Sequence, residues 1–142
     1  MIVVGIDGSA GSRAALRFAA EEADLRKTTL KVVSAWHLPT GLYTAPTYVN
    51  LDLDVLRKDA AGIADQELVE VLGADRAKAL EVVIREGNAA EALLEESRGA
   101  EMLVVGSRGH GGFAGLLLGS VSQQCSAHAA CPVVVVRDHH PG

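Results

Sequence analysis

Short apolar runs rich in valine and isoleucine recur along the chain, separated by longer segments of mixed polarity. They are continuous rather than alternating, which is typical of strands buried on both faces of a parallel sheet. The five runs cover residues 2–6, 30–36, 80–84, 102–105 and 133–136. Because helical segments lie between them, the pattern predicts an α/β fold whose parallel strands are joined by right-handed crossovers.

Apolar positions at helical spacing predict the helices between these strands. Four such positions follow the first strand: Leu16, Ala19, Ala20 and Ala23. Either Ser9 or Ser12 can serve as the N-cap of this helix. A second helix is predicted over 55–72, ending at Gly73, because glycine commonly follows the last turn of a helix. Two shorter helices are predicted over residues 88–97 and 120–129.

Residues 37–54 show no hydrophobic period and predict a long loop. Loops longer than about 12–15 residues in a compact domain are often functional, so two interpretations stay open, a lid over a ligand and a mobile connection. The last residues, with His139 and His140, predict a short solvated tail. No repeat or linker divides the chain, and we expect one domain over 1–142.

Composition narrows the classes of function. The 142 residues include 13 Lys and Arg against 18 Asp and Glu, a net charge of −5. This argues against binding to nucleic acid, which needs a basic surface. The apolar runs are far shorter than the roughly 20 residues that cross a bilayer, and the N-terminus carries no secretion pattern. We expect a cytoplasmic protein without membrane insertion, whose Cys125 and Cys131 are buried or incidental thiols.

The stretch most informative about function covers residues 104–122, VVGSRGHGGFAGLLLGSVS. It leaves a predicted strand, passes through glycines and enters a predicted helix at Ser120. The glycines of its first part are Gly106, Gly109, Gly111, Gly112 and Gly115. Glycines let backbone N–H groups converge on an anion, and a helix N-terminus adds partial positive charge. The number of glycines favours a phosphate cradle over the alternative, a plain strand-to-helix turn.

Ser120 and Gln123 have the spacing of a capping box, which predicts Ser120 as the N-cap with or without a ligand. A standard P-loop is excluded because the chain contains no Gly-Lys pair. The loose match of residues 109–114 to the dinucleotide pattern is weak, since it follows the fourth predicted strand instead of the first.

Asp7 directly follows the first predicted strand, at the edge of the sheet where the loop after Val105 also lies. Two roles are equally compatible with this position. The carboxylate can contact a ribose, an adenine or Mg²⁺, or it can form an Asx turn or cap at the start of the first helix.

These residues together resemble the universal stress protein family over the whole chain. The resemblance is carried by the segments VVGIDGS, KVVSAW and IREGNAAEALL and by the spacing Gly106-x2-Gly109-x9-Gly119-Ser120. That spacing is similar to the signature of the ATP-binding branch of the family. The resemblance implies a Rossmann-like three-layer sandwich, with a five-stranded parallel sheet in the order 3-2-1-4-5 and helices on both faces. It also implies a homodimer formed through the last strand, in agreement with the tendency of apolar edge strands to pair.

The resemblance further implies ATP, with Mg²⁺, as the ligand. The positions that correspond to the surroundings of the adenine and ribose are Gly5, Asp7 and Ala35. Those that correspond to the surroundings of the ribose and phosphates are Val105, Gly106, Gly109, Gly119, Ser120, Val121 and Ser122. Gly5 stands where some members have proline and Ala35 replaces a bulkier aliphatic residue, which leaves less apolar surface for the adenine.

We therefore expect an ATP-binding regulatory protein of the stress response that acts through a protein partner. Two alternatives remain: a dimeric interaction module that needs no nucleotide, and a slow ATP hydrolase or autokinase on the same fold. Arg108 and His110 could reach a γ-phosphate. No base with an orienting partner can be identified from spacing, so no catalytic residue is predicted.

Overall fold

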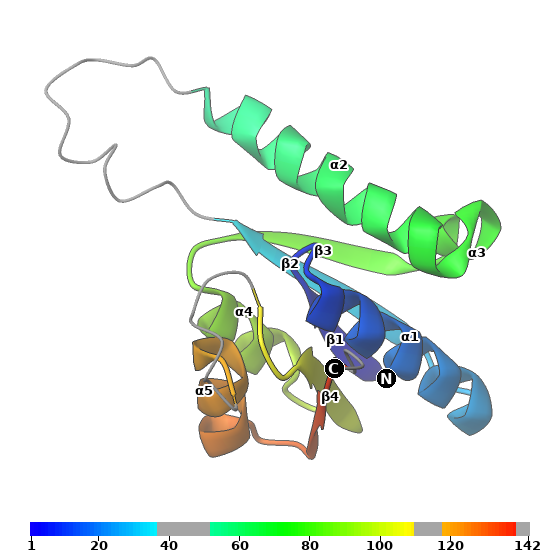
Figure 1. The fold of residues 1–142 in the computed structure, drawn as a ribbon, viewed down its shortest axis with the longest axis vertical. Helices are drawn as coiled ribbons and strands as arrows, with labels where there is room; N and C mark the ends of the chain where they lie inside the picture. The colour runs from blue at the N-terminus through cyan, green and yellow to red at the C-terminus, as the bar shows by residue number, and fades with distance from the viewer. Residues whose placement is uncertain (37–51, 110–117, 139–142) are drawn as a thin grey trace, which may run out of the picture.

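The computed structural model describes residues 1–36, 52–109 and 118–138. The described residues form a five-stranded sheet, parallel throughout, in the order β3-β2-β1-β4-β5 (Figure 1). The strands are β1 (Ile2–Ile6), β2 (Leu30–Trp36), β3 (Glu81–Glu86), β4 (Met102–Gly106) and β5 (Val133–Val136). The fold class and the strand order predicted above are thereby confirmed.

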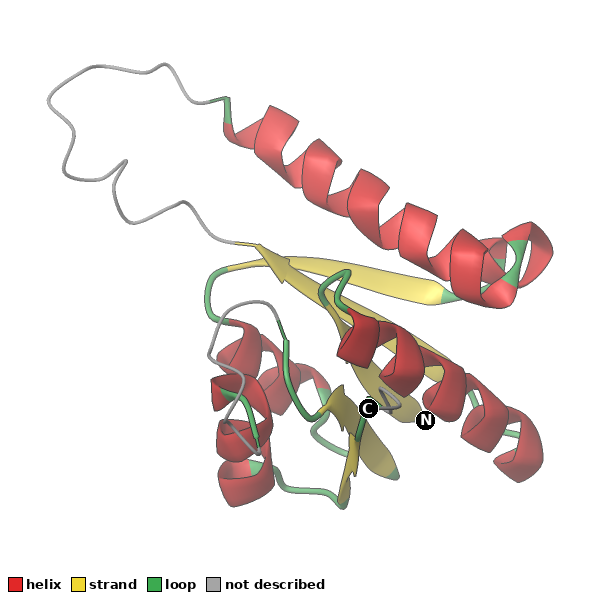
Figure 2. Cartoon of the chain, in the orientation of Figure 1, coloured by secondary structure: helices red, strands yellow, loops and turns green. Residues whose placement is uncertain are grey.

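Helices cover both faces of this sheet, as Figure 2 shows. They are α1 (Ala10–Arg26), α2 (Leu53–Leu72), α3 (Ala74–Lys78), α4 (Ala89–Glu96) and α5 (Ser120–His128). α1 and α2 pack on one face, and α4 and α5 pack on the other. None of the helices in the described part of the chain is both long and apolar enough to span a membrane.

The continuous apolar runs are explained by the two cores that these layers enclose. In β1, Ile2 and Val4 contact the core under α1 and α2, whereas Val3 between them contacts the core under α4 and α5. All three side chains are fully buried. Because successive side chains of a strand point to opposite faces, a strand covered on both sides needs an apolar residue at every position.

Helix ends mostly follow the polar side chains that the sequence offers as caps. Ser9, and not Ser12, is the N-cap of α1, and its side chain accepts a hydrogen bond from the Ser12 N–H. Asn88 does the same at α4, where its side chain accepts from the Glu91 N–H. Asp52 caps α2 through the Asp54 N–H. The predicted loop over 37–54 is therefore wrong for its last two residues, while residues 37–51 lie outside the described part.

The structure also differs from the prediction at β3 and α3, while β4, α4 and α5 differ from it by one residue at one or both ends. β3 was expected over 80–84 but runs to Glu86, because its register with β2 continues to the pair of Trp36 and Glu86. The short helix α3 was not predicted, since its five residues are too few for a hydrophobic period. It begins directly after Gly73, whose φ of +90° suits glycine and separates α3 from α2.

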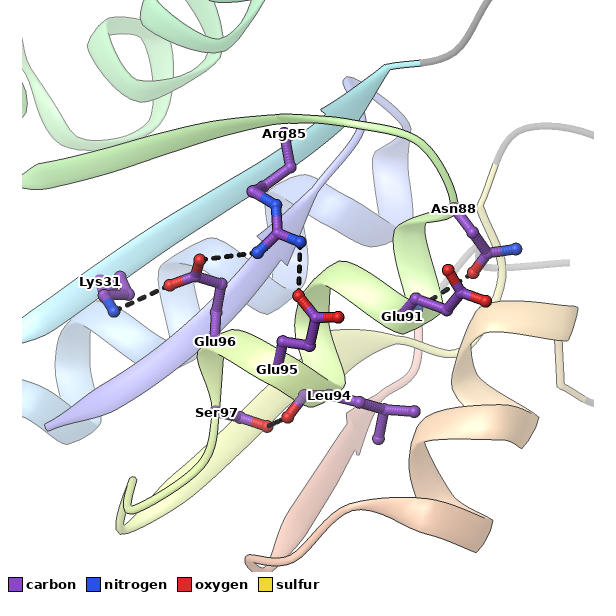
Figure 3. A network of polar contacts seen from close by, with 8 residues as sticks. All are labelled: Lys31, Arg85, Asn88, Glu91, Leu94, Glu95, Glu96 and Ser97. Carbon is purple, nitrogen blue, oxygen red and sulfur yellow. Dashed lines mark hydrogen bonds and ion pairs between the residues drawn. The ribbon is translucent and has the colours of Figure 1, made fainter.

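A network of charged side chains joins α4 to β2 and β3 (Figure 3). Glu96 lies between two cations, with Oε2 3.0 Å from Lys31 Nζ and Oε1 2.9 Å from Arg85 Nη1. Arg85 Nη2 also contacts Glu95 Oε2 at 2.5 Å. The ammonium of Lys31, and then Arg85, hold the pKa of Glu96 below its ordinary value. This network holds the C-terminal turn of α4 on the sheet, while the N-terminal turn reaches the cavity described next.

Candidate functional site

One cavity lies at the carboxyl ends of β1, β2 and β4, beside the N-terminal turns of α1, α4 and α5. Its volume is about 250 Å³. This is close to the lower end of the range of about 300–1,000 Å³ that is usual for small-molecule sites. All ten predicted site residues line it: Gly5, Asp7, Ala35, Val105, Gly106, Gly109, Gly119, Ser120, Val121 and Ser122. The structure thus brings together residues that the sequence spreads over more than a hundred positions.

Seven further residues line the cavity: sequence reasoning missed Ile6, Ser9, Ser12, Val33, Ala89 and Leu93, and the seventh is Arg108. A signal was available for some of them. Val33 precedes Ala35 by two residues in β2 and so shares its face. Ala89 and Leu93 are four residues apart and share a face of α4. Arg108 was considered only for a γ-phosphate, and the structure exposes it at the cavity.

The cavity has an apolar side made by strand ends and α4, with Val33, Ala35, Leu93 and Val105. Gly5 matters to this side because of a close approach. A Cβ atom added to Gly5 would lie 2.7 Å from Leu93 Cδ1, closer than side chains tolerate. The missing side chain at position 5 therefore makes room for Leu93, which supplies apolar surface next to Gly5.

Asp7 adopts the Asx-turn role that the sequence left open. Its Oδ1 accepts hydrogen bonds from the Ser9 N–H at 2.9 Å and from the Ser9 hydroxyl at 2.5 Å. The alternative of a helix cap is wrong for Asp7 itself, because Ser9 is the N-cap of α1. A Cβ added to Gly109 would lie 2.5 Å from Asp7 Oδ2, so the carboxylate and the Gly109 backbone stand side by side at the cavity.

The start of α5 differs from the predicted capping box. Gly119 is the N-cap, Ser120 is the first helical residue, and no side chain caps the helix. Gln123 does not bond back to position 120; its Nε2 donates to the Leu118 carbonyl at 2.9 Å. The Gly119 N–H donates to the Ser107 carbonyl at 2.6 Å. This bond holds Gly119 in an extended conformation as the N-cap, one residue before the predicted N-cap Ser120. The capping-box prediction is therefore wrong.

This arrangement leaves the first amides of α5 facing the cavity. The first helical hydrogen bond runs from the Gln123 N–H to the Gly119 carbonyl, so the N–H groups of Ser120, Val121 and Ser122 precede it. All three residues line the cavity. The Ser122 hydroxyl is used elsewhere, 3.0 Å from the Ser107 carbonyl. A helix N-terminus with free amides is suited to a phosphate or another anion.

Glycines of the loop after β4 serve close backbone contacts as well as the cavity. A Cβ added to Gly106 would lie 2.8 Å from the carbonyl carbon and oxygen of Gly11 in α1. One added to Gly119 would make only ordinary contact, 3.4 Å from Arg108 Cα. A plain strand-to-helix turn, the alternative to a phosphate cradle, therefore accounts for the glycine at position 106, where packing leaves no room for a side chain. It does not account for the glycine at position 119, where a side chain would have room. The remaining members of the predicted cradle, His110, Gly111, Gly112 and Gly115, lie outside the described residues.

No preformed metal site is present in the part of the chain that the structure describes: its His, Cys, Asp and Glu residues form no group that could hold an ion. Both cysteines are free thiols, as predicted. Burial raises the pKa of the Cys125 thiol to about 11, so it stays protonated at neutral pH and unreactive.

The sequence is similar to proteins of one family. The model described as "Universal stress protein family" matches residues 1–137. A universal stress protein from Mycolicibacterium smegmatis is 37% identical over 142 residues, which cover 95% of this chain and 47% of the relative. One from Mycobacterium tuberculosis is 33% identical over 150 residues, covering 96% of this chain and 45% of the relative. The chain thus spans about half the length of these curated relatives.

Solved structures are similar as well. UspA from Lactobacillus plantarum has a TM-score of 0.75 at 20% identity, with 96% of each chain covered, a likeness of fold alone. A universal stress protein in complex with cAMP has a TM-score of 0.68 at 28% identity, with 97% of each chain covered. The universal stress protein from Archaeoglobus fulgidus in complex with dAMP has a TM-score of 0.58 at 26% identity, with 94% of each chain covered.

Proposed function

This chain belongs to the universal stress protein family, and from that premise we propose that it binds ATP, with Mg²⁺, in the cavity at the carboxyl ends of β1, β2 and β4. The observation that carries the proposal is the start of α5. Its first three amides precede the first helical bond and carry no side-chain cap, and their residues line a cavity that also has apolar lining from β2, β4 and α4. An adenine nucleotide has an aromatic base with apolar faces at one end and anionic phosphates at the other, so it suits both parts of the lining.

The residues present fit such a ligand. Val33, Ala35 and Leu93 offer an apolar surface for the purine, and Asp7 offers a carboxylate to the ribose hydroxyls. The uncapped amides of Ser120 and Val121 would donate to the phosphates. Mg²⁺ is usually held by one or two carboxylates together with the phosphates, which suits a site with no ion-binding cluster of its own. The metal would supply charge neutralisation between the phosphate oxygens.

Two related structures support an adenine nucleotide in particular. These structures are complexes with cAMP and with dAMP, and both proteins exceed 25% identity to this chain. Both ligands contain adenine and a phosphate. A regulatory role in the stress response, acting through a protein partner that distinguishes the nucleotide-bound state, is the function that we propose for this binding.

The decisive test is a calorimetric titration of nucleotide-stripped protein with MgATP, alongside GTP and NAD. We expect saturable binding of MgATP that Gly119→Val weakens at least tenfold. A Cβ at position 119 has room, so the branched side chain would occupy the cavity lining next to the phosphate-facing amides without forcing the backbone apart.

Gly62→Val is the matched control, because Gly62 lies on α2 with no atom within 4 Å of an added Cβ and does not line the cavity. Its affinity should equal that of the wild type. If the wild type shows neither heat nor thermal stabilisation at millimolar MgATP, the nucleotide proposal fails and the interaction module takes its place. Equal affinity in the Gly119→Val and wild-type proteins would place any binding elsewhere.

We also propose self-association through β5. β5 has one partner in the sheet, β4, and its four valines are only half-buried. An apolar edge strand of this kind invites pairing with another chain. Light scattering between about 1 and 100 µM should give the mass of a dimer, about twice 14.8 kDa. The mass of a monomer at every concentration would contradict this proposal and leave the nucleotide site untouched.

A further inference from the structure

A buried carboxylate of α2 holds the turn that carries Asp7. Glu67 is only 2% exposed, and both of its oxygens accept hydrogen bonds from the segment after β1. Oε2 accepts from the Gly8 N–H at 2.9 Å, and Oε1 accepts from the Ser12 hydroxyl at 2.6 Å. Ser12 Oγ in turn accepts from the Asp7 N–H at 2.9 Å. The amides of Asp7 and Gly8 are thus both bound to Glu67, directly or through Ser12.

This carboxylate is not what packing alone would select at position 67. Its neighbours Ala64 and Leu68 belong to the apolar core between α2 and the sheet. Burial raises the pKa of Glu67, and the hydrogen bonds from Ser12 and Gly8 act against that rise. The other charged groups facing it are Asp7, which raises the pKa, and Arg13 of α1, which lowers it. A buried ionisable group is costly unless its partners are well placed.

The turn needs these acceptors because no regular element supplies them. Gly8 has a φ of +81°, which takes the chain out of β1 and toward the N-cap of α1. The turn places Asp7 and Ser9 on the cavity lining, beside Ser12 of α1, whereas Glu67 is not a lining residue. Gly8 is half-buried, and an amide that loses its acceptor in a partly buried position costs free energy, so we expect the turn to rearrange without Glu67.

We propose that Glu67 is a positioning residue of the nucleotide site, which fixes the Asp7–Gly8–Ser9 turn from α2 and so directs the Asp7 carboxylate toward the bound ligand. The inference rests on the proposed function. It makes affinity at the cavity depend on a residue that contacts no ligand and comes 59 residues after Gly8.

The test compares Glu67→Leu and Glu67→Gln with Leu68→Ala in titrations with MgATP and in urea unfolding. Glu67→Leu removes both acceptors and should weaken the affinity at least tenfold. Glu67→Gln keeps one oxygen for the Gly8 N–H but cannot accept from Ser12 with its amide nitrogen, so it should restore part of the affinity. Leu68→Ala also destabilises α2 but touches no part of the turn, and its affinity should stay within twofold of the wild type.

The pH profile separates positioning from a general loss of structure. Protonation of Glu67 turns one acceptor oxygen into a donor, so the affinity of the wild type should fall as the pH drops through the raised pKa of this carboxyl. Asp7 and Arg13 are present in every variant. Glu67→Gln carries no ionisable group at position 67, so this step should be missing from its profile.

Hydrogen exchange of the Gly8 amide in nucleotide-free protein tests whether Glu67 holds the turn, independently of whether the protein binds a nucleotide. We expect a protected amide in the wild type and at least tenfold faster exchange in Glu67→Leu, or in Glu67→Gln should the leucine variant fail to fold. If the wild type binds no nucleotide, the proposed function fails and the positioning role fails with it, while Gly8 exchange still decides whether Glu67 holds the turn. Unchanged affinity together with a protected Gly8 amide in the variants would overturn the inference.

Discussion

Gly106→Ala is expected to lower the free energy of unfolding by about 1–3 kcal/mol and to weaken nucleotide binding, because the end of β4 and the start of α1 are in backbone contact there. The added Cβ would lie 2.8 Å from the carbonyl carbon and oxygen of Gly11. Neither side of this contact is a flexible side chain that can turn away, so the two elements must separate. Gly106 has no positive φ, which makes the effect steric.

The loss of affinity follows from what is attached to Gly106. The next residue, Ser107, donates to Val136 through its N–H and accepts the Gly119 N–H with its carbonyl. A shift of β4 therefore moves the N-cap of α5 and its amides. Urea unfolding measures the first effect, and titration with MgATP measures the second.

Gly62→Ala provides the control for Gly106→Ala. It makes the same chemical change in an open position of α2, where helix propensity alone should stabilise the protein by up to about 1 kcal/mol. Opposite signs for the two variants are the expected outcome. A Gly106→Ala protein as stable as the wild type would show that the approach of β4 to α1 is looser than the structure has it.

Leu68→Ala is expected to cost about 2–5 kcal/mol of unfolding free energy, the range for large-to-small changes in a close-packed core. Leu68 is fully buried between α2 and the sheet. The only other buried side chains of α2 are Ala64 and Glu67. Leu68 therefore supplies most of the fully buried apolar surface of this helix.

Val69→Ala is the matched control for Leu68→Ala. Val69 is the next residue of the same helix and is 45% exposed, so its truncation should change the stability by less than about 1 kcal/mol. Equal losses at positions 68 and 69 would contradict the packing of α2 described above. If Leu68→Ala loses stability but keeps its affinity for MgATP, it is also a valid control for the Glu67 variants.

The sequence determined the sheet and the location of the cavity. Strands covered on both faces must be apolar at every position, and such runs are visible without knowledge of their partners. The predicted site residues lie near the ends of strands, directly after strands or at the start of a helix, as Gly5, Asp7 and Ser120 do. Parallel strands bring their carboxyl ends to one edge, so these residues gather there whatever the details of packing.

Some helix caps could be predicted from the sequence, and one could not. Asn88 and Ser9 cap their helices through amides three residues away, and local spacing predicts such bonds. At α5 the local spacing indicated Ser120, but the structure starts the helix after Gly119. The decisive contact there is the bond from the Gly119 N–H to Ser107, twelve residues earlier and across the loop. A pattern confined to four residues contains no information about that contact.

Only the tertiary structure decided the roles of Gly5 and Glu67. In the sequence Glu67 is one more acidic residue of a helix rich in charges, and acidic residues usually face water. Its burial depends on the rotation of α2 about its axis, and its partners depend on the distance between α2 and the turn after β1. Gly5 likewise makes room for Leu93 of α4, which is far away along the chain. The hydrophobic period of a segment predicts which of its residues are buried. Which side chains from different elements contact each other depends on how the helices and strands pack together.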